Sequence, residues 1–191
     1  MLIKGDETLE ELEAITENCS ACDLCKHRNK IVFGEGNPHA DIMCIGEGPG
    51  YYEDREGKPF IGKSGQLLDK IFHACGLDRY KDIYIGNIVK CHPPENRNPT
   101  TEERNTCIQY LFRQIDLIDP KIIILLGGTA LKGLFDPNAR ITQVRGKWLL
   151  WENRWVMPTF HPSALLRNQN LKADAWSDFQ KVIKKYREIH H

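Results

Sequence analysis

The stretch KIIILL, residues 121–126, contains the longest purely aliphatic run of the chain. A short aliphatic run of this kind is typical of a strand buried on both faces, and it is far too short to cross a bilayer. Working outward, similar apolar runs occur at residues 41–46 (DIMCIG), 83–89 (IYIGNIV) and 155–160 (WVMPTF). The sequence therefore predicts four buried strands.

Helical patterns lie between these runs. Apolar residues recur at helical spacing over residues 66–75, and Gly76 supplies a stop signal. Thr100 and Glu103 form a capping box before a helix that we expect to end near residue 118. The expected apolar side of that helix comprises Ile108, Leu111, Phe112, Ile115 and Ile118. This alternation predicts a three-layer α/β/α fold with a central, four-stranded, mainly parallel sheet.

Size and composition favour one globular domain over residues 1–191, which we expect to be a monomer. The chain is 41% hydrophobic and has a formal net charge of zero, so a large non-specific basic surface is not expected. Residues 1–15 are acidic and amphipathic, unlike a secretory leader. We therefore expect a cytoplasmic protein with reduced cysteines and no contact with a membrane.

Ligands of parallel α/β sheets bind at the carboxyl ends of the strands, which here precede the loops 47–65, 90–99, 127–128 and 161–167. The first loop has a G-x-G-x-G spacing, and its carboxylates Glu47 and Glu53 disfavour a bound pyrophosphate. A ligand that is neutral, or that becomes cationic during reaction, suits this loop better. Phe60, in the same loop, is either a stacking surface for a planar ring or a core residue.

Two polar residues belong to predicted strand ends. His161 directly follows the fourth strand, where catalytic groups gather, although single histidines are often structural. Asn87 interrupts an apolar strand, and a buried amide must find hydrogen-bond partners. It either reads the edge of a base or ties down a loop.

Four of the seven cysteines, Cys19, Cys22, Cys91 and Cys107, resemble the ligand set of one metal centre. A ferredoxin run is not complete, because the cysteine and proline that should follow Cys25 are absent. A zinc ribbon requires two C-x-x-C pairs, whereas the second group here is widely spaced. Structural zinc remains an alternative on spacing alone.

Basic residues are concentrated in two regions, where they are either candidates for phosphate contacts or ordinary solvated charges. These residues are Lys90, His92, Arg97 and Arg104 in the first region, and Arg140, Arg145, Lys147, Arg154 and Arg167 in the second.

Six collinear segments, spanning nearly the whole chain, resemble the family 4 uracil-DNA glycosylases, which are iron-sulfur members of their superfamily. The segments are CSACDL (residues 19–24), VFGEGNP (32–38), GEGPGYYED (46–54), GKPFIGKSGQLLD (57–69), NIVKCHPPENRNPT (87–100) and PTFHPSALLRN (158–168).

The resemblance implies an enzyme of base excision repair that flips uracil out of single- or double-stranded DNA and hydrolyses its N-glycosidic bond, leaving an abasic site. It also implies a 4Fe-4S cluster held by Cys19, Cys22, Cys91 and Cys107, with Cys22 and Cys25 as a rival pair. The alternative is a metal- or iron-sulfur-binding α/β module without glycosylase activity.

Site residues follow from the same resemblance. Glu47 and His161 are the expected catalytic residues, and Glu53 is a second carboxylate whose role is open. The expected uracil-binding residues are Gly46, Glu47, Gly48, Phe60, Asn87 and His161. The expected DNA contacts are Leu165 and Leu166, as a wedge, and Arg167 on a phosphate.

Overall fold

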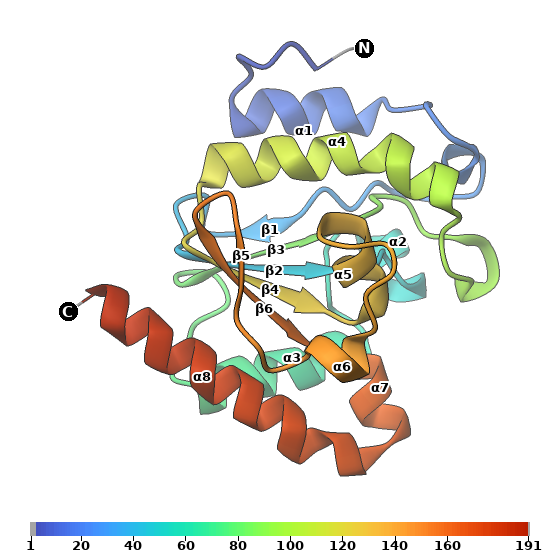
Figure 1. Cartoon of the computed structure of the whole chain (residues 1–191). Helices are drawn as coiled ribbons and strands as arrows, with labels where there is room; N and C mark the ends of the chain where they lie inside the picture. Colours follow the sequence, from blue (N-terminus) through green and yellow to red (C-terminus); the bar gives the residue numbers. More distant parts are fainter. Residues whose placement is uncertain (1–2, 191) are drawn as a thin grey trace.

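The computed structural model describes residues 3–190, so the two ends of the expected domain, residues 1–2 and 191, lie outside it. A single six-stranded sheet, in the order β1-β3-β2-β4-β6-β5, forms the middle layer (Figure 1). The strands are β1 (Glu35–Gly36), β2 (Ile42–Gly46), β3 (Ile83–Asn87), β4 (Ile122–Leu126), β5 (Leu149–Trp151) and β6 (Arg154–Thr159).

The four strands predicted from the apolar runs are β2, β3, β4 and β6, and they pair in parallel. The α/β class and the four-stranded parallel centre are therefore confirmed. The structure adds an antiparallel strand at each edge, β1 beside β3 and β5 beside β6. Both edge strands are too short to produce an apolar run, and for that reason periodicity did not reveal them.

Helices cover both faces of the sheet. The α-helices are α1 (Leu9–Glu17), α2 (Tyr51–Glu56), α3 (Lys63–Ala74), α4 (Thr101–Ile118), α5 (Gly128–Leu134), α6 (Ile141–Val144), α7 (Pro162–Arg167) and α8 (Lys172–His190). Three short 3-10 helices are η1 (Asp23–Lys26), η2 (Pro94–Asn96) and η3 (Gln169–Leu171).

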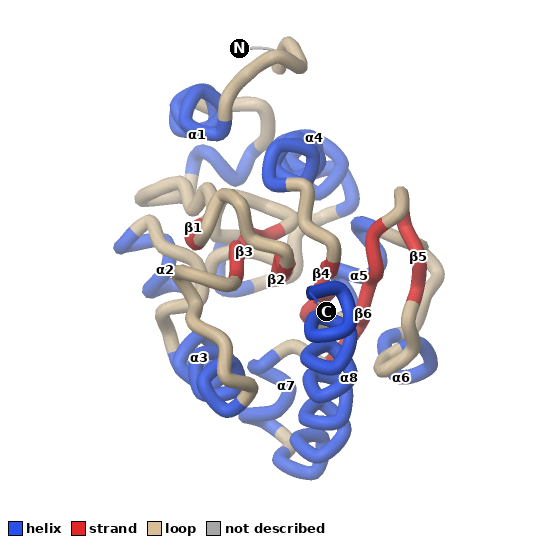
Figure 2. The backbone as a smooth tube through the Cα atoms, turned by 90° about the vertical axis from the view of Figure 1, so that its left-hand side faces the viewer, coloured by secondary structure: helices blue, strands red, loops and turns tan. Residues whose placement is uncertain are grey.

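Two hydrophobic clusters define the three layers. One cluster joins α1, α4 and α5 to one face of the sheet, and the other joins α3 and α8 to the opposite face. Figure 2 shows α1 and α4 on one side of the strands and α3 and α8 on the other. The sheet is thus buried on both faces, as a parallel sheet requires.

The capping box of Thr100 and Glu103 is present, and α4 ends at Ile118, as predicted. Leu111 and Ile115 are fully buried in the core. Phe112 differs from the prediction, because it is 37% exposed and stacks on Trp151 with ring centroids 6.0 Å apart. The new edge strand β5 carries this partner, which the helical pattern could not foresee.

The helix predicted over residues 66–75 is α3, which begins three residues earlier, at Lys63. Gly76 follows the helix with a φ of 74°, a conformation that favours glycine, so the stop signal was interpreted correctly. The short helix α2 lies within the first loop, residues 47–65, and has no counterpart in the prediction.

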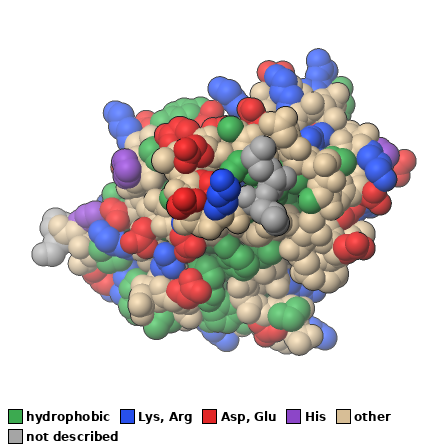
Figure 3. All heavy atoms as spheres, turned by 90° about the horizontal axis from the view of Figure 1, so that it is seen from above, with side chains coloured by type: hydrophobic (Ala, Val, Ile, Leu, Met, Phe, Trp, Pro, Cys, Tyr) green, Lys and Arg blue, Asp and Glu red, His purple; other side chains and the backbone are tan. Residues whose placement is uncertain are grey.

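Acidic and basic side chains are interspersed on the face seen in Figure 3, in keeping with the zero net charge. Within residues 3–190, no helix is both long enough and apolar enough to span a membrane.

Candidate active site and cysteine centre

A cavity of about 660 Å³ opens at the carboxyl ends of the parallel strands. Glu47 follows β2, Gly127 follows β4, and His161 follows β6, so adjacent strands deliver their loops to one place. The structure brings together six of the predicted site residues in the wall of this cavity: Glu47, Gly48, Glu53, Phe60, His161 and Arg167.

Gly46 and Asn87 are register partners at the ends of β2 and β3. A Cβ atom at Gly46 would lie 2.5 Å from Asn87 Oδ1 and 2.6 Å from Phe60 Cζ, so only glycine fits there. Asn87 is 1% exposed, and its Oδ1 accepts no hydrogen bond from any described residue. A buried amide oxygen without a donor is costly, and a ligand N–H would satisfy it.

Phe60 has a left-handed backbone with a φ of 50°, which is rare for an aromatic residue. Its carbonyl accepts a hydrogen bond from Arg79 Nη1 at 2.8 Å. A Cβ atom at Gly65 would lie 1.8 Å from the same carbonyl oxygen, so the chain packs closely around it. The ring belongs to the core and also lines the cavity, so the core interpretation of Phe60 is confirmed, and its use as a stacking surface stays a prediction.

His161 precedes α7, and its Nδ1 accepts the backbone N–H of Ser163 at 3.1 Å. A nitrogen that accepts carries no proton, so the neutral imidazole holds its proton on Nε2. Burial, together with the nearby Arg167 charge, lowers the pKa of His161 to about 4. The ring is therefore a neutral donor at physiological pH. Its centroid is 5.6 Å from that of Phe60.

The two carboxylates of the first loop have different surroundings. Glu53 is 9% exposed, and its Oε1 accepts the backbone N–H groups of Ile61, at 2.9 Å, and Gly62, at 2.8 Å. Glu47 is half-buried, and its Oε2 accepts the hydroxyl of Thr129. Glu53 thus fixes the backbone of Ile61 and Gly62, next to Phe60. Glu47 is instead fixed by the side chain of Thr129, which also lines the cavity.

Thr129 lines the cavity but is not among the predicted site residues. It directly follows residues 127–128, one of the loops expected at the carboxyl end of a strand. Arg79, which reaches Phe60 from a distant part of the chain, was also not predicted. The strand-end rule could have identified the threonine. No local signal marks the arginine, because its role depends on tertiary contacts.

The expected DNA wedge needs a correction. Leu165 is 2% exposed and packs with Phe160 and Ala175, so it is a core residue rather than a DNA contact. Leu166 is 45% exposed, and Arg167 lines the mouth of the cavity. Adjacent residues on a helix point in different directions, and only one of the two leucines faces solvent.

Several candidate phosphate contacts are also corrected. Lys90 is 1% exposed and cannot reach DNA in this structure. Arg145 pairs with the buried Asp178 at 2.6 Å, and Arg154 pairs with Asp119 at 2.9 Å. Arg97 pairs with Glu103 at 2.7 Å, while still lining the cavity. Ion pairs, which a sequence does not reveal, account for the three arginines.

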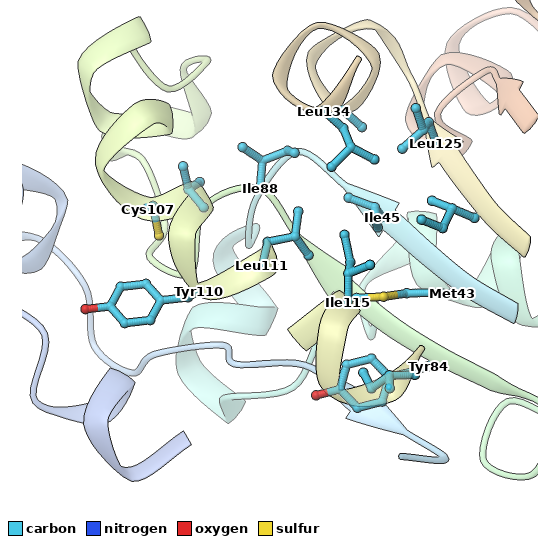
Figure 4. Packing of buried hydrophobic residues seen from close by; sticks show 14 of the residues in the cluster. Met43, Ile45, Tyr84, Ile88, Cys107, Tyr110, Leu111, Ile115, Leu125 and Leu134 are labelled. Atoms are coloured by element: carbon cyan, nitrogen blue, oxygen red, sulfur yellow. The ribbon is translucent and has the colours of Figure 1, made fainter. Parts of the chain in front are cut away.

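A second, smaller cavity is lined by the four predicted ligands, Cys19, Cys22, Cys91 and Cys107, together with Cys25. Cys107 and Tyr110 project from α4 (Figure 4). All seven cysteines are free thiols. The part of the chain that the structure describes holds no group of three or more His, Cys, Asp or Glu side chains placed to bind a single metal ion.

Hydrogen-bond donors face the sulfur atoms of this centre. Arg28 Nη1 lies 3.4 Å from Cys91 Sγ, and the backbone N–H of Lys90 lies 3.3 Å from Cys107 Sγ. Burial raises the pKa of Cys91 to about 11 and that of Cys107 to about 12. These thiols therefore need a bound cation or cluster to become thiolates at neutral pH.

A family model described as the uracil DNA glycosylase superfamily matches residues 33–180. The chain belongs to the uracil-DNA glycosylase superfamily. The match covers every strand of the sheet and every residue that lines the larger cavity, and it begins after Cys19 and Cys22.

Within this superfamily, the chain is similar to proteins named type-4 uracil-DNA glycosylase. It is 44% identical to the one from Thermotoga maritima, over 86% of each chain. It is 42% identical to the one from Sulfurisphaera tokodaii, over 92% of this chain and 84% of that protein. It is 40% identical to the one from Archaeoglobus fulgidus, over 92% of each. The family resemblance seen in the sequence is thereby confirmed.

Proposed function

We propose that this protein is a DNA repair glycosylase that flips uracil out of DNA and hydrolyses its N-glycosidic bond, leaving an abasic site. The observation that carries the proposal is the buried Asn87 Oδ1 without a donor, close to the ring of Phe60, which in turn lies beside the neutral His161. The protein acts as a single-domain, cytoplasmic monomer on single- or double-stranded DNA.

Uracil presents an N–H group between two carbonyl oxygens. Asn87 Oδ1 accepts that N–H, and the NH₂ group of the same amide donates to the neighbouring carbonyl. The Phe60 ring stacks on the base, and Gly46 and Gly48 let the backbone approach it closely. These contacts offset the cost of taking the base out of the stack.

Bond cleavage leaves negative charge on uracil, and His161 stabilises it. The Nε2–H of a neutral imidazole donates to the carbonyl oxygen on which the charge develops. A single preorganised donor of this kind typically contributes a factor of about 10²–10³ in rate.

Glu47 acts on the sugar side of the bond. Its carboxylate stabilises the cationic character of the sugar in the transition state and orients the attacking water. Thr129 fixes the carboxylate by donating to Oε2. Glu53 has a positioning role, because its Oε1 is engaged by two backbone N–H groups near Phe60.

DNA is held beside the cavity mouth by the exposed Leu166, which fills the space left by the flipped base, and by Arg167, which meets a phosphate. Leu165 supports this segment from within the core.

We infer that Cys19, Cys22, Cys91 and Cys107 would hold a 4Fe-4S cluster; the inference is supported by their shared cavity and by the N–H donors that face two of the sulfur atoms, since hydrogen bonds to sulfur are typical of such clusters. When bound, the cluster joins the N-terminal segment to the loop after β3 and to α4. Cys25 lines the same cavity and is the rival to Cys19.

The proposal is tested by incubating the protein with a uracil-containing oligonucleotide and then cleaving abasic sites with alkali. We expect strand breaks at uracil and none when thymine replaces it. We expect Asn87→Ala to slow the formation of breaks strongly while leaving a measurable rate, whereas Asn138→Ala, at an exposed position, does not change it. Absence of breaks in both single- and double-stranded substrates would favour the alternative, a cluster-binding module without glycosylase activity.

A further inference from the structure

Lys90 is a lysine within the core, with 1% of its surface exposed. Its ammonium donates to the backbone carbonyl of Asn87 at 3.0 Å and to Gln114 Oε1 at 2.5 Å. It also lies 5.9 Å from the ring centroid of Phe33. The side chain is thus directed back toward the end of β3 rather than toward DNA.

Gln114 extends this contact into a network. Its Nε2 donates to the carbonyl of Phe33 at 3.0 Å and to the hydroxyl of Tyr84 at 3.2 Å. Gln114 lies on α4, two turns beyond Cys107, whose sulfur accepts the backbone N–H of Lys90. The lysine therefore links the last residue of β3 with the helix that carries one of the clustered cysteines.

A buried ammonium is costly when no anion accompanies it. Within residues 3–190, no carboxylate lies within ion-pair distance of Lys90 Nζ. Its two hydrogen-bond acceptors are neutral, so no ion pair offsets the cost of burying the ammonium. The contacts made by the ammonium then point to a role other than stability.

The side-chain amide of Asn87 is a group whose orientation depends on how its backbone is held. Its Oδ1 has no partner among the described residues, so no other hydrogen bond to that atom fixes the direction in which the amide points. The peptide carbonyl of the same residue is the acceptor of Lys90. Recognition of a base edge requires placement within about 0.5 Å, and a displacement of about 1 Å can lower a rate a hundredfold.

We propose that Lys90 is a positioning residue for base recognition, acting with Gln114 to hold the Asn87 peptide so that its side-chain amide meets the flipped base. The inference rests on the proposed function, since it assigns a support to the residue that reads uracil. It also gives the cysteine centre a physical link to the pocket, through Cys107, Lys90 and Asn87.

The first test is Lys90→Met, which removes the ammonium and keeps the length of the side chain. We expect kcat on uracil-containing DNA to fall about 10- to 100-fold. The affinity for undamaged DNA and the iron content stay within about twofold, since neither depends on Asn87 in this scheme. Lys132→Met, at an exposed position, is the matched control and retains full activity. Wild-type kcat in Lys90→Met would overturn the proposal.

A double-mutant cycle separates positioning from general destabilisation. If Lys90 acts through Asn87, the loss caused by Lys90→Met disappears when Asn87 is already alanine. Equal losses in the wild-type and Asn87→Ala backgrounds would mean that the lysine does not act through Asn87, and the proposal would be rejected.

A second variant covers the case in which Lys90→Met does not fold. Gln114→Met removes the other acceptor of the ammonium, and Tyr84→Phe, which removes only the tyrosine contact of Gln114, is its control. We expect Gln114→Met to lower kcat and Tyr84→Phe to leave it unchanged; equal effects of the two would contradict the proposal.

The NMR signals of the Asn87 side-chain amide provide a readout that does not require activity. We expect them to shift in Lys90→Met and not in Lys132→Met. If the wild type releases no uracil, the proposed function fails, and these signals still decide the structural claim. If the Asn87 side-chain amide signals are the same in Lys90→Met as in the wild type, the proposal is overturned, whether or not the wild type releases uracil.

Discussion

His161 Nδ1 accepts the backbone N–H of Ser163, and this one contact decides which imidazole nitrogen carries the proton. The Nδ1 also lies 2.8 Å from the Ser163 hydroxyl, which can serve as a second donor to it. Because both partners belong to the first turn of α7, the tautomer is fixed by local structure and does not depend on a bound substrate.

Replacement of His161 by alanine should lower kcat about 10²–10³-fold with a smaller effect on KM, because the donor acts mainly on charge that develops in the transition state. Single-turnover release of uracil measures this. Ser163→Ala is the control, since it keeps the backbone N–H that orients the ring, and its kcat should stay within about threefold of the wild type. An active His161→Ala would exclude His161 as the donor.

Stability should decrease on acidification through His161. Its folded pKa, about 4, lies below the ordinary value of about 6.5, so the unfolded chain binds the proton more readily. The contribution is complete above pH 6.5 and is lost as the pH falls toward 4. Urea unfolding at pH 7.5 and pH 5 should show a larger loss in the wild type than in His161→Gln, by about 1–2 kcal/mol. Equal losses would contradict the lowered pKa.

Replacing each of the two carboxylates of the first loop should affect a different quantity, kcat for Glu47 and the free energy of unfolding for Glu53. Glu47→Gln should lower kcat by about 10² or more, because it removes the charge beside the sugar. Glu53→Gln should mainly lower the free energy of unfolding, by about 1–3 kcal/mol, because it weakens hydrogen bonds from Ile61 and Gly62. Parallel kinetics and urea unfolding measure both. Full activity of Glu47→Gln would end its assignment.

The choice between Cys19 and Cys25 can be settled by two serine variants. We expect Cys19→Ser to lose iron and visible absorbance, and Cys25→Ser to keep both. Cys19 and Cys22 both act electrostatically on Cys91, whereas Cys25 acts on Cys22 and on Lys26. Iron analysis and absorption spectra are the measurements, with Cys75→Ser as a control at a site remote from the cavity. Loss of iron in Cys25→Ser alone would reverse the assignment.

Leu166→Ala should reduce cleavage of double-stranded substrate more than cleavage of single-stranded substrate, because only a duplex leaves a space to be filled. Leu150→Ala, at another exposed leucine, should affect neither substrate. The ratio of the two rates is the measurement. An unchanged ratio in Leu166→Ala would count against a wedge.

The apolar runs predicted the four central strands because each is buried on both faces, and the capping box at Thr100 placed the start of α4. The edge strands escaped detection because two or three residues carry no period. Phe112 was assigned to the core because its true partner, Trp151, comes from such an edge strand.

The cavity wall was predictable where a residue lies within two positions of a strand end, as Glu47 and His161 do. The sequence did not predict which residues are buried where contacts between distant segments determine burial. Leu165 and Leu166 are neighbours with the same side chain, and only the packing of α7 determines which is buried. From the sequence, Lys90 is expected to be a surface charge, and its burial depends on the packing of α4 against the loop that follows β3.

The left-handed backbone of Phe60 is present before any DNA arrives. A phenylalanine in that conformation costs about 1–2 kcal/mol, and contacts from Arg79 and the close packing of Gly65 hold it in place during folding. The backbone that carries the ring is thus held by the fold alone. The placement of the ring is therefore a property of the folded chain itself, and substitutions at Arg79 or Gly65, outside the cavity wall, should displace the ring.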